Sequence, residues 1–255
     1  MSRHTTAAGT MTADTDTDTD TDTDTGTGTG AAAFFDVDET LIRPKSMFSF
    51  LRFHLNRRGE PDSTYDRLTT PLHRAAAQGV PRSEINRRYY RLYAGESAAR
   101  LADAGHAWFD AELTTGDLLI PETAHRLHQH RQRGDFVVLL SGSFYACLDP
   151  LARHTGADWA IGTRPVIRDG LLTGDVVTPM IGTAKARAAR IVAACHGLDP
   201  AACTAYGDHH SDIELLASVG TPVAVGADPV LGAHARRHGW ERLAAPSYPL
   251  APAAP

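Results

Sequence analysis

The chain has 255 residues, 42% of them hydrophobic and 22% charged, which is enough for one α/β core with an inserted subdomain. Its formal net charge of −5 arises in residues 1–30: removing that segment's six Asp from the 30 acidic residues and its one Arg from the 25 basic residues leaves 24 of each. This balance gives no electrostatic basis for nucleic-acid binding, and no apolar run is long enough to cross a membrane.

The two ends of the chain lack the composition of a folded domain. Residues 1–30 repeat Thr, Asp and Gly without an apolar stretch, which predicts a disordered tail and no signal peptide. Residues 246–255 are rich in Pro and predict an extended tail. The three Cys form no Cys-x-x-Cys pair, which indicates a reducing compartment, so we expect a cytoplasmic protein.

The first predicted strand, Ala31–Phe35, is an apolar run followed by carboxylates at Asp36 and Asp38. Such a run is typical of a buried parallel strand whose carboxyl end opens into a site. On an extended strand residues i and i+2 face the same way, so the two carboxylates are expected to converge on one ligand. Buried carboxylate pairs are costly without a cation, which indicates Mg²⁺ and phosphate chemistry. The Asp-x-Asp matches in residues 14–24 follow no strand and are discounted.

Residues 43–118 show helical periodicity and predict an inserted helical segment. Pro61, Pro71 and Pro81 are expected to separate its helices. Three amphipathic helices are predicted, and their apolar residues are Met47, Phe50, Leu51, Phe53 and Leu55; Ile85, Tyr89, Leu92 and Tyr93; and Leu101, Trp108, Phe109 and Leu113.

Helix and strand patterns alternate after the insertion. The predicted helices are Pro121–Gln132, Ala146–His154, Ala184–Cys195 and Ser211–Ala217, and the predicted strands are Phe136–Leu140, Trp159–Gly162, Thr204–Tyr206 and Pro222–Val225. This alternation predicts an α/β fold with a doubly wound parallel sheet, which binds its ligand at the carboxyl ends of the strands.

Three further motifs fall where such a site is expected. Ser141 and Gly142 end a β-branched strand, where a hydroxyl and a backbone amide can approach an anion. Lys185 lies at the start of a helix, where the helix dipole opposes a cation unless an anion is bound nearby. Asp208 follows a short strand, with Asp212 four residues further on.

In this order and spacing the four motifs resemble the haloacid dehalogenase superfamily, most closely its subfamily IB, the phosphoserine-phosphatase-like hydrolases. The resemblance covers residues 31–245. It implies a Rossmann-like catalytic core of residues 31–42 and 119–245, with a helical cap at 43–118 that closes over the site. The segment Asp169–Gly174 resembles the short connection between the Ser strand and the Lys in that branch.

The resemblance implies a phosphatase. Asp36 is the expected nucleophile, forming an aspartyl-phosphate, and Asp38 the expected general acid and base. Mg²⁺ is expected on the Asp36 carboxylate, the Asp38 backbone carbonyl, Asp208 and water.

The remaining motif residues receive supporting roles. Asp212 is expected at the metal site, where it orients a metal-bound water, or alternatively in a pair with Lys185. Ser141, the Gly142 amide and Lys185 are expected to bind the transferring phosphoryl group. Thr40 is expected to brace the catalytic loop through a hydrogen bond.

The expected partner is a small phosphorylated metabolite. Lys45 lies nine residues after Asp36, where phosphoserine phosphatases place an ammonium-binding Glu, so it is expected to contact substrate and disfavour phosphoserine. Sugar, cyclitol or other small organic phosphates are favoured, with phosphoserine as the alternative. A phosphotransferase that uses the same intermediate and a non-catalytic phosphate-binding module are the rival functions.

The histidines are not expected to bind metal. His209 and His210 are adjacent, which is not the i, i+4 spacing that places two ligands on one helix face. His125, His128 and His130 are expected on a solvated helix face.

Overall fold

The computed structural model describes residues 30–244, so the tail predicted at 246–255, and all of the tail predicted at 1–30 except residue 30, lie outside the described residues. Within the described part, six strands form one sheet in the order β3-β2-β1-β6-β7-β8, and every neighbouring pair is parallel. The strands are β1 (Ala32–Asp36), β2 (Phe136–Ser141), β3 (Trp159–Gly162), β6 (Thr204–Gly207), β7 (Thr221–Val225) and β8 (Glu241–Leu243). The doubly wound parallel sheet predicted from the sequence is confirmed.

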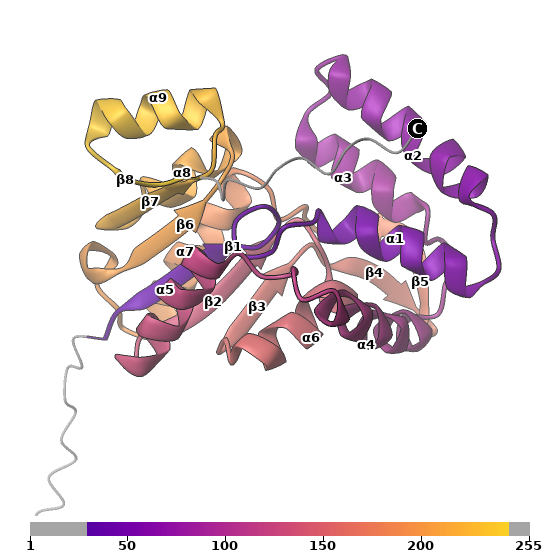
Figure 1. Ribbon diagram of the computed structural model, residues 1–255, viewed down its shortest axis with the longest axis horizontal. Coiled ribbons are helices and arrows are strands. Elements are labelled where there is room, and N and C mark those ends of the chain that lie inside the picture. Colours follow the sequence, from indigo (N-terminus) through magenta and orange to yellow (C-terminus); the bar gives the residue numbers. More distant parts are fainter. Residues whose placement is uncertain (1–29, 245–255) are drawn as a thin grey trace, which may run out of the picture.

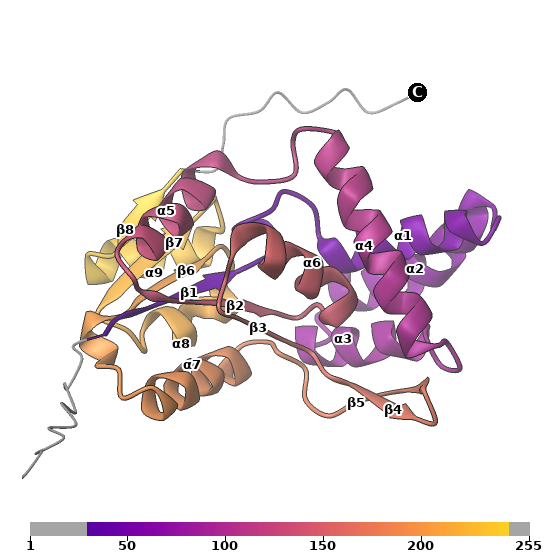
Figure 2. The ribbon, with the colours of Figure 1, turned by 90° about the horizontal axis from the view of Figure 1, so that it is seen from below.

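Helices cover both faces of this sheet (Figures 1 and 2). They are α5 (Pro121–Gln132) and α6 (Tyr145–Thr155) on one face, and α7 (Thr183–Cys195), α8 (Ile213–Leu216) and α9 (Pro229–His238) on the other. In β1, Ala33 and Phe35 join the core on the first face, whereas Ala32 and Phe34 join the core on the second. Because both faces are buried, the strand reads as a continuous apolar run in the sequence.

Four helices lie between β1 and α5, at one end of the molecule (Figure 1). They are α1 (Ser46–Arg57), α2 (Asp62–Ala77), α3 (Arg82–Arg91) and α4 (Ala98–Thr114). The two connections to the core lie side by side, since the Arg43 amide donates to the Leu118 carbonyl at 2.9 Å. Helix α4 packs closely on α6: a Cβ on Gly105 would lie 1.9 Å from the Ala146 carbonyl oxygen, so only Gly fits at this crossing.

Helix α2 was not predicted, and Pro71, which was expected to separate helices, lies inside it. Pro71 is exposed, while Leu72 and Ala75 beside it are buried against the insertion core. The buried face stabilises the helix despite the backbone hydrogen bond that a proline removes. Pro61 and Pro81 do precede helices, as expected.

The segment expected as a short connection after the Ser strand forms a β-hairpin. Its strands are β4 (Pro165–Arg168) and β5 (Leu171–Val176), joined through Asp169 and Gly170, which both have positive φ. The hairpin also holds the insertion: the Gly95 amide donates to Leu172 O at 2.7 Å, and the Ala98 amide to Gly170 O at 2.9 Å. The insertion is therefore hydrogen-bonded to the core chain at a second place, far from its own ends.

One histidine departs from the expected solvated face. His125 and His128 are exposed on α5, but His130 is buried, with its Nε2 2.9 Å from the Tyr206 hydroxyl and its Nδ1 2.7 Å from Asp135 Oδ2. Helix α5 turns this residue towards the sheet, where two polar partners make burial tolerable.

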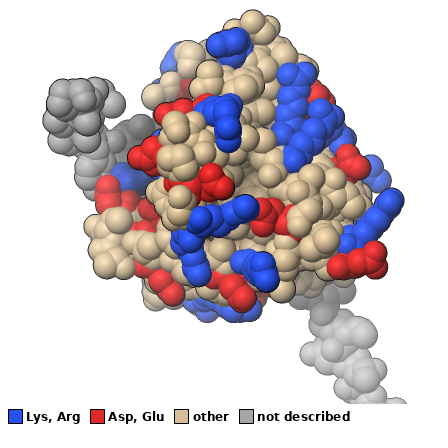
Figure 3. Space-filling model, turned by 90° about the vertical axis from the view of Figure 1, so that its right-hand side faces the viewer, with Lys and Arg blue, Asp and Glu red and all other residues tan. Residues whose placement is uncertain are grey.

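Between residues 30 and 244, no helix has both the length and the apolar character needed to cross a bilayer. On the face that carries the insertion, basic and acidic side chains are interspersed (Figure 3).

Candidate active site

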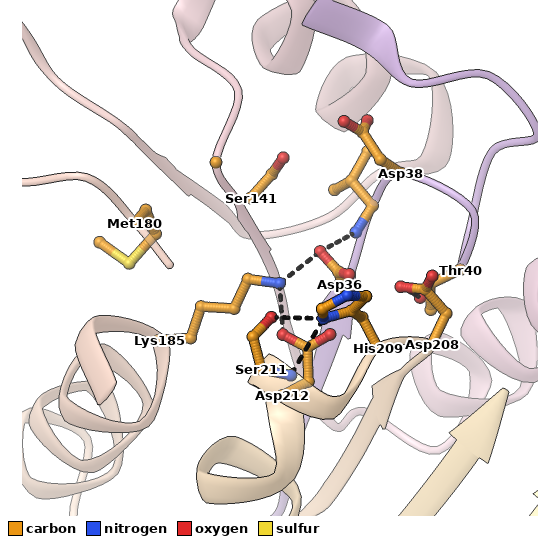
Figure 4. A network of polar contacts seen from close by, with 12 residues as sticks. Asp36, Asp38, Thr40, Ser141, Met180, Lys185, Asp208, His209, Ser211 and Asp212 are labelled. Atoms are coloured by element: carbon orange, nitrogen blue, oxygen red, sulfur yellow. Dashed lines mark hydrogen bonds and ion pairs between the residues drawn. The ribbon is translucent and has the colours of Figure 1, made fainter. Parts of the chain in front are cut away.

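The predicted site residues lie at the carboxyl ends of the central strands. Asp36 is the last residue of β1, Ser141 the last of β2, and Asp208 follows β6 directly. Because β1 pairs with both β2 and β6, these side chains meet at one edge of the sheet (Figure 4). The topology therefore brings together residues that lie far apart in the chain.

A buried lysine joins two of the carboxylates. Lys185, in the first turn of α7, places its Nζ 2.6 Å from Asp36 Oδ1 and 2.7 Å from Asp212 Oδ1 (Figure 4). Burial alone favours the neutral amine, but the charges of Asp212 and Asp36 outweigh it and raise the pKa of Lys185. Burial also acts against ionised Asp36, yet Lys185 and hydrogen bonds lower the pKa of this carboxyl, which stays an anion. Of the two roles expected for Asp212, the pair with Lys185 is present.

Three carboxyl groups form a cluster that one lysine cannot balance when all three are ionised. Oxygen atoms of Asp36, Asp208 and Asp212 all lie within 4.8 Å of one another. Burial and then the Asp36 charge raise the pKa of Asp208 to about 9. Asp212 Oδ2 is buried without a hydrogen-bond partner. Carboxylate oxygens crowded in this way, one of them unpartnered, fit a hard divalent cation such as Mg²⁺.

A glycine makes this cluster possible. A Cβ on Gly207 would lie 2.8 Å from the Cβ of Asp212. Only a residue without a side chain lets Asp212 approach the end of β6 this closely. In the Gly-Asp pair, Gly207 therefore allows the close approach, and Asp208 supplies a carboxyl group to the cluster.

Asp38 lies apart from the cluster. Strand β1 ends at Asp36, and the Asp38 carboxylate points away from the cluster (Figure 4), so its convergence with Asp36 on one ligand stays a prediction. Instead Asp38 Oδ1 accepts a hydrogen bond from the Ser46 amide at 3.1 Å, at the start of the insertion. Burial, which outweighs the Ser46 hydrogen bonds, raises the pKa of Asp38 to about 6. Its side chain is thus separate from the predicted metal ligands; a role for its backbone carbonyl stays a prediction.

Thr40 contacts the cluster from the loop after β1. Its Oγ1 donates to Asp208 Oδ1 at 3.1 Å, and its carbonyl accepts from Thr123 Oγ1 at 2.7 Å. The side chain therefore orients Asp208 and fixes the loop to α5, which agrees with the bracing role expected from the sequence.

The Ser141–Gly142 turn is held by two residues that the sequence did not single out. Asn86 Nδ2 and the Tyr90 hydroxyl, both on α3, donate to the Gly142 carbonyl at 2.8 and 3.0 Å. The other side of this peptide, the Ser143 amide, donates to Ser141 Oγ at 3.0 Å. In a trans peptide C=O and N–H point in opposite directions, so α3 aims the Ser143 amide at the Ser141 hydroxyl.

Lys45 occupies the N-cap position of α1, without a side-chain hydrogen bond to the helix, and lines a cavity beside the site. Its Nζ lies 3.2 Å from Glu39 Oε2, and both side chains are about half exposed. The positive charge on which the substrate argument rested is therefore offset by a neighbour that sequence spacing alone did not reveal.

His209 and His210 meet Asp228, which precedes α9. His210 Nδ1 lies 3.1 Å and His209 Nε2 3.9 Å from Asp228 Oδ2, and the three groups are close enough to share a cation. The argument against a histidine metal site considered only helix spacing and missed this third residue. Asp228 also caps α9 through its other oxygen, which accepts from the Val230 and Leu231 amides.

An ionised carboxylate, a buried lysine and a carboxylate cluster able to hold a cation lie at the end of a doubly wound sheet, an arrangement suited to phosphoryl transfer. Residues 33–217 match the model of the haloacid dehalogenase-like hydrolase family, and the chain belongs to this family.

Similar proteins agree with this assignment. The chain is 34% identical over 218 residues to phosphoserine phosphatase SerB1 of Mycobacterium tuberculosis, covering 82% of this chain and 69% of the relative. It is 33% identical over 228 residues to the inhibition of morphological differentiation protein of Streptomyces azureus, covering 83% and 77%.

Solved structures show the same fold. A Bordetella pertussis protein of unknown function matches with a TM-score of 0.75 and 25% identity over 84% of this chain and 98% of its own. A substrate-bound phosphoserine phosphatase matches with a TM-score of 0.63 and 19% identity over 84% and 92%. The chain is a phosphoserine-phosphatase-like hydrolase, a phosphoric monoester hydrolase.

Proposed function

We propose that the protein hydrolyses a small organic phosphomonoester with Mg²⁺, through an aspartyl-phosphate on Asp36. The observation that carries this proposal is the buried contact of Lys185 with Asp36 beside the carboxylates of Asp208 and Asp212. A nucleophile must be ionised, and Lys185 keeps Asp36 so despite its burial. A purely structural ion pair leaves Asp208 unexplained, since it adds a third, partly buried carboxyl beside Asp36 and Asp212.

The residues divide the reaction between them. Asp36 attacks phosphorus, and Lys185 holds the carboxylate in place and offsets charge on the phosphoryl oxygens. Asp38 has no ion pair among the described residues, and it protonates the departing alkoxide. It then removes a proton from the water that hydrolyses the intermediate. The Ser141 hydroxyl and the Gly142 amide donate to the phosphoryl oxygens.

The metal fits the residues that are present. Asp36, Asp208 and the Asp38 carbonyl would hold Mg²⁺, with Asp212 orienting its water or holding Lys185. When bound, the ion would neutralise negative charge on the phosphate oxygens and on the carboxylate cluster.

Metal removal is expected to lower the rate of phosphate release at least about a hundredfold, and added Mg²⁺ to restore it. Without a cation, the negative charge of the carboxylate cluster would repel the phosphate dianion. Mg²⁺ should also raise the melting temperature of the wild type, but not of Asp208→Asn. Asp110→Asn, on the exposed face of α4, is the matched control and should keep the rise. Full activity in excess EDTA after exhaustive metal removal would contradict the metal role.

Helix α3 has a positioning role in this proposal, because Tyr90 and Asn86 fix the peptide that orients Ser141. Tyr90→Phe removes one hydrogen bond, worth about 1 kcal/mol, so we expect a roughly fivefold loss in kcat/KM and equally weaker inhibition by inorganic phosphate. Tyr93→Phe is the matched control, since that buried hydroxyl contacts Tyr89 instead. Equal effects of both variants on phosphate inhibition would leave Tyr90 a structural residue only.

The substrate is a small phosphorylated metabolite, bound between the core and the helical insertion, which acts as a cap. Since Glu39 pairs with Lys45, the sequence argument for sugar or cyclitol phosphates loses its electrostatic basis. Phosphoserine, the substrate in the name of one relative, is the alternative. Phosphate release from a panel of phosphomonoesters, with alcohol acceptors added to detect phosphotransfer, separates these possibilities.

A further inference from the structure

A cavity of about 590 Å³ lies between the helical insertion and the catalytic residues. Asp38 and His209 line it, and so do Asn86 and Ile181, which both approach Gly142: a Cβ on Gly142 would lie 2.6 Å from Ile181 Cδ1 and 3.3 Å from Asn86 Nδ2. The cavity therefore opens beside the proposed proton donor and the phosphate-binding turn. Its natural occupant is the leaving group of the substrate, an inference that rests on the proposed function.

The lining of this cavity is mixed, since eight of its eighteen residues are charged, His or Asn, and most of its apolar side chains come from the insertion. The apolar side chains come from α1, α2, α3, the α2–α3 loop and the segment before α7: Phe48, Leu72, Ala76, Val80, Ile85 and Ile181. Side chains of this kind stabilise a ligand by removing its apolar surface from water.

Two polar side chains of α3 in this lining, Tyr89 and Asn86, are already hydrogen-bonded within the protein. The Tyr89 hydroxyl donates to the Met47 carbonyl. The Asn86 amide donates to Gly142 O at 2.8 Å and accepts from Thr163 Oγ1 at 3.2 Å. Against the apolar side chains of the insertion, a sugar or cyclitol would lose hydrogen bonds to water without replacement, which costs binding free energy.

Charged groups of the lining do not favour a zwitterionic leaving group either. Its acidic residues are Asp38 and Glu39, of which Glu39 already pairs with Lys45 at 3.2 Å. Arg82 donates to Ser211 Oγ at 3.0 Å and so bridges the insertion and the core. An ammonium group would compete with Lys45 for Glu39, or it would favour the ionised form of Asp38, which cannot donate a proton.

We propose that the substrate is the phosphate monoester of a hydrophobic alcohol, whose alkyl or aryl body fills this cavity. The ester P–O bond breaks as the Asp36–phosphorus bond forms, and the alkoxide takes its proton from Asp38. Water then cleaves the acyl phosphate and releases inorganic phosphate. The cavity volume of about 590 Å³ falls within the roughly 300–1,000 Å³ typical of sites that enclose small organic ligands.

The test is a series of unbranched primary alkyl phosphates from ethyl to octyl, assayed with Mg²⁺ below their micelle concentrations. Their alkoxides differ little in basicity, so chain length changes contact with the cavity and not the chemistry. A fully buried methylene contributes about a fourfold gain, so we expect kcat/KM to rise roughly two- to fourfold per methylene until the cavity is filled. Glucose 6-phosphate, inositol phosphate and phosphoserine should fall at least tenfold below hexyl phosphate.

Two variants test whether the chain-length dependence of kcat/KM arises in the cavity. Ile85→Ser should flatten the chain-length dependence, and Val80→Ser, on the adjoining loop, should do so independently if the first variant folds poorly. Ile191→Ser, at an exposed position of α7, is the matched control and should keep the wild-type slope. A flat series with ready hydrolysis of ethyl phosphate, or preference for a polyol phosphate or phosphoserine, overturns the leaving-group inference and leaves the proposed function standing. No release from any phosphomonoester overturns the proposed function, and the inference falls with it.

Discussion

Asp36→Asn is expected to abolish turnover while the protein stays folded. The substitution keeps the shape of the side chain but removes the nucleophile, and loss of a covalent nucleophile costs about 10⁴-fold or more in kcat. Lys185 loses its ion pair with Asp36 but keeps the one with Asp212, and removing the Asp36 charge relieves its repulsion of ionised Asp208. We therefore expect a melting temperature equal to that of the wild type or higher, measured by circular dichroism alongside phosphate release.

The matched control for this variant is Asp103→Asn on the exposed side of α4, which should leave both activity and stability unchanged. If Asp36→Asn kept near-normal turnover, Asp36 could not be the covalent nucleophile, and the Lys185 contact would be structural.

Asp38→Asn is expected to slow hydrolysis of alkyl phosphates by at least about a hundredfold, because an alkoxide leaves slowly without a proton donor. An aryl phosphate with an acidic phenol needs little protonation, so its loss should be smaller. The Asn amide oxygen can still accept the Ser46 amide, and the loop geometry should persist.

The measurement for Asp38→Asn compares the two leaving groups in the wild type and the variant. Equal losses with alkyl and aryl phosphates would show that Asp38 supports the loop and does not supply the proton.

The strand ends could be predicted from the sequence because their signal is local. Apolar runs that stop at Asp36, Ser141 and Asp208 place three groups at one sheet edge whatever the remaining packing. The helices of the insertion were predicted where aromatic residues recur, but α2 was missed, because its buried face is made of Thr, Leu and Ala around an exposed Pro71.

Contacts between distant segments could not be read from the chain. Periodicity places Asn86 and Tyr90 on a helix, but only the packed structure shows that both donate to Gly142. In the same way, Lys45 reads as a free cation until Glu39, in a turn with positive φ, pairs with it. Asp38 lies outside the cluster of Asp36, Asp208 and Asp212, because the Ser46 amide, at the start of the insertion, holds its side chain.

Rival functions separate on the fate of the phosphoryl group. A phosphotransferase would share Asp36 and Lys185 but pass phosphate to an added alcohol, whereas a phosphate-binding module would release none. The buried pair of Asp36 with Lys185 keeps a carboxylate ionised next to the proposed phosphate site, which a protein that only binds phosphate does not require.

The most direct test of the account is the mass of the acid-quenched Asp38→Asn protein after mixing with an aryl phosphate and Mg²⁺. This variant forms the intermediate with a good leaving group but activates water poorly, so the intermediate should accumulate. The account predicts protein heavier by one phosphoryl group, with the added mass on the peptide that contains Asp36. Phosphate release without any covalent adduct, or an adduct on another residue, would contradict it.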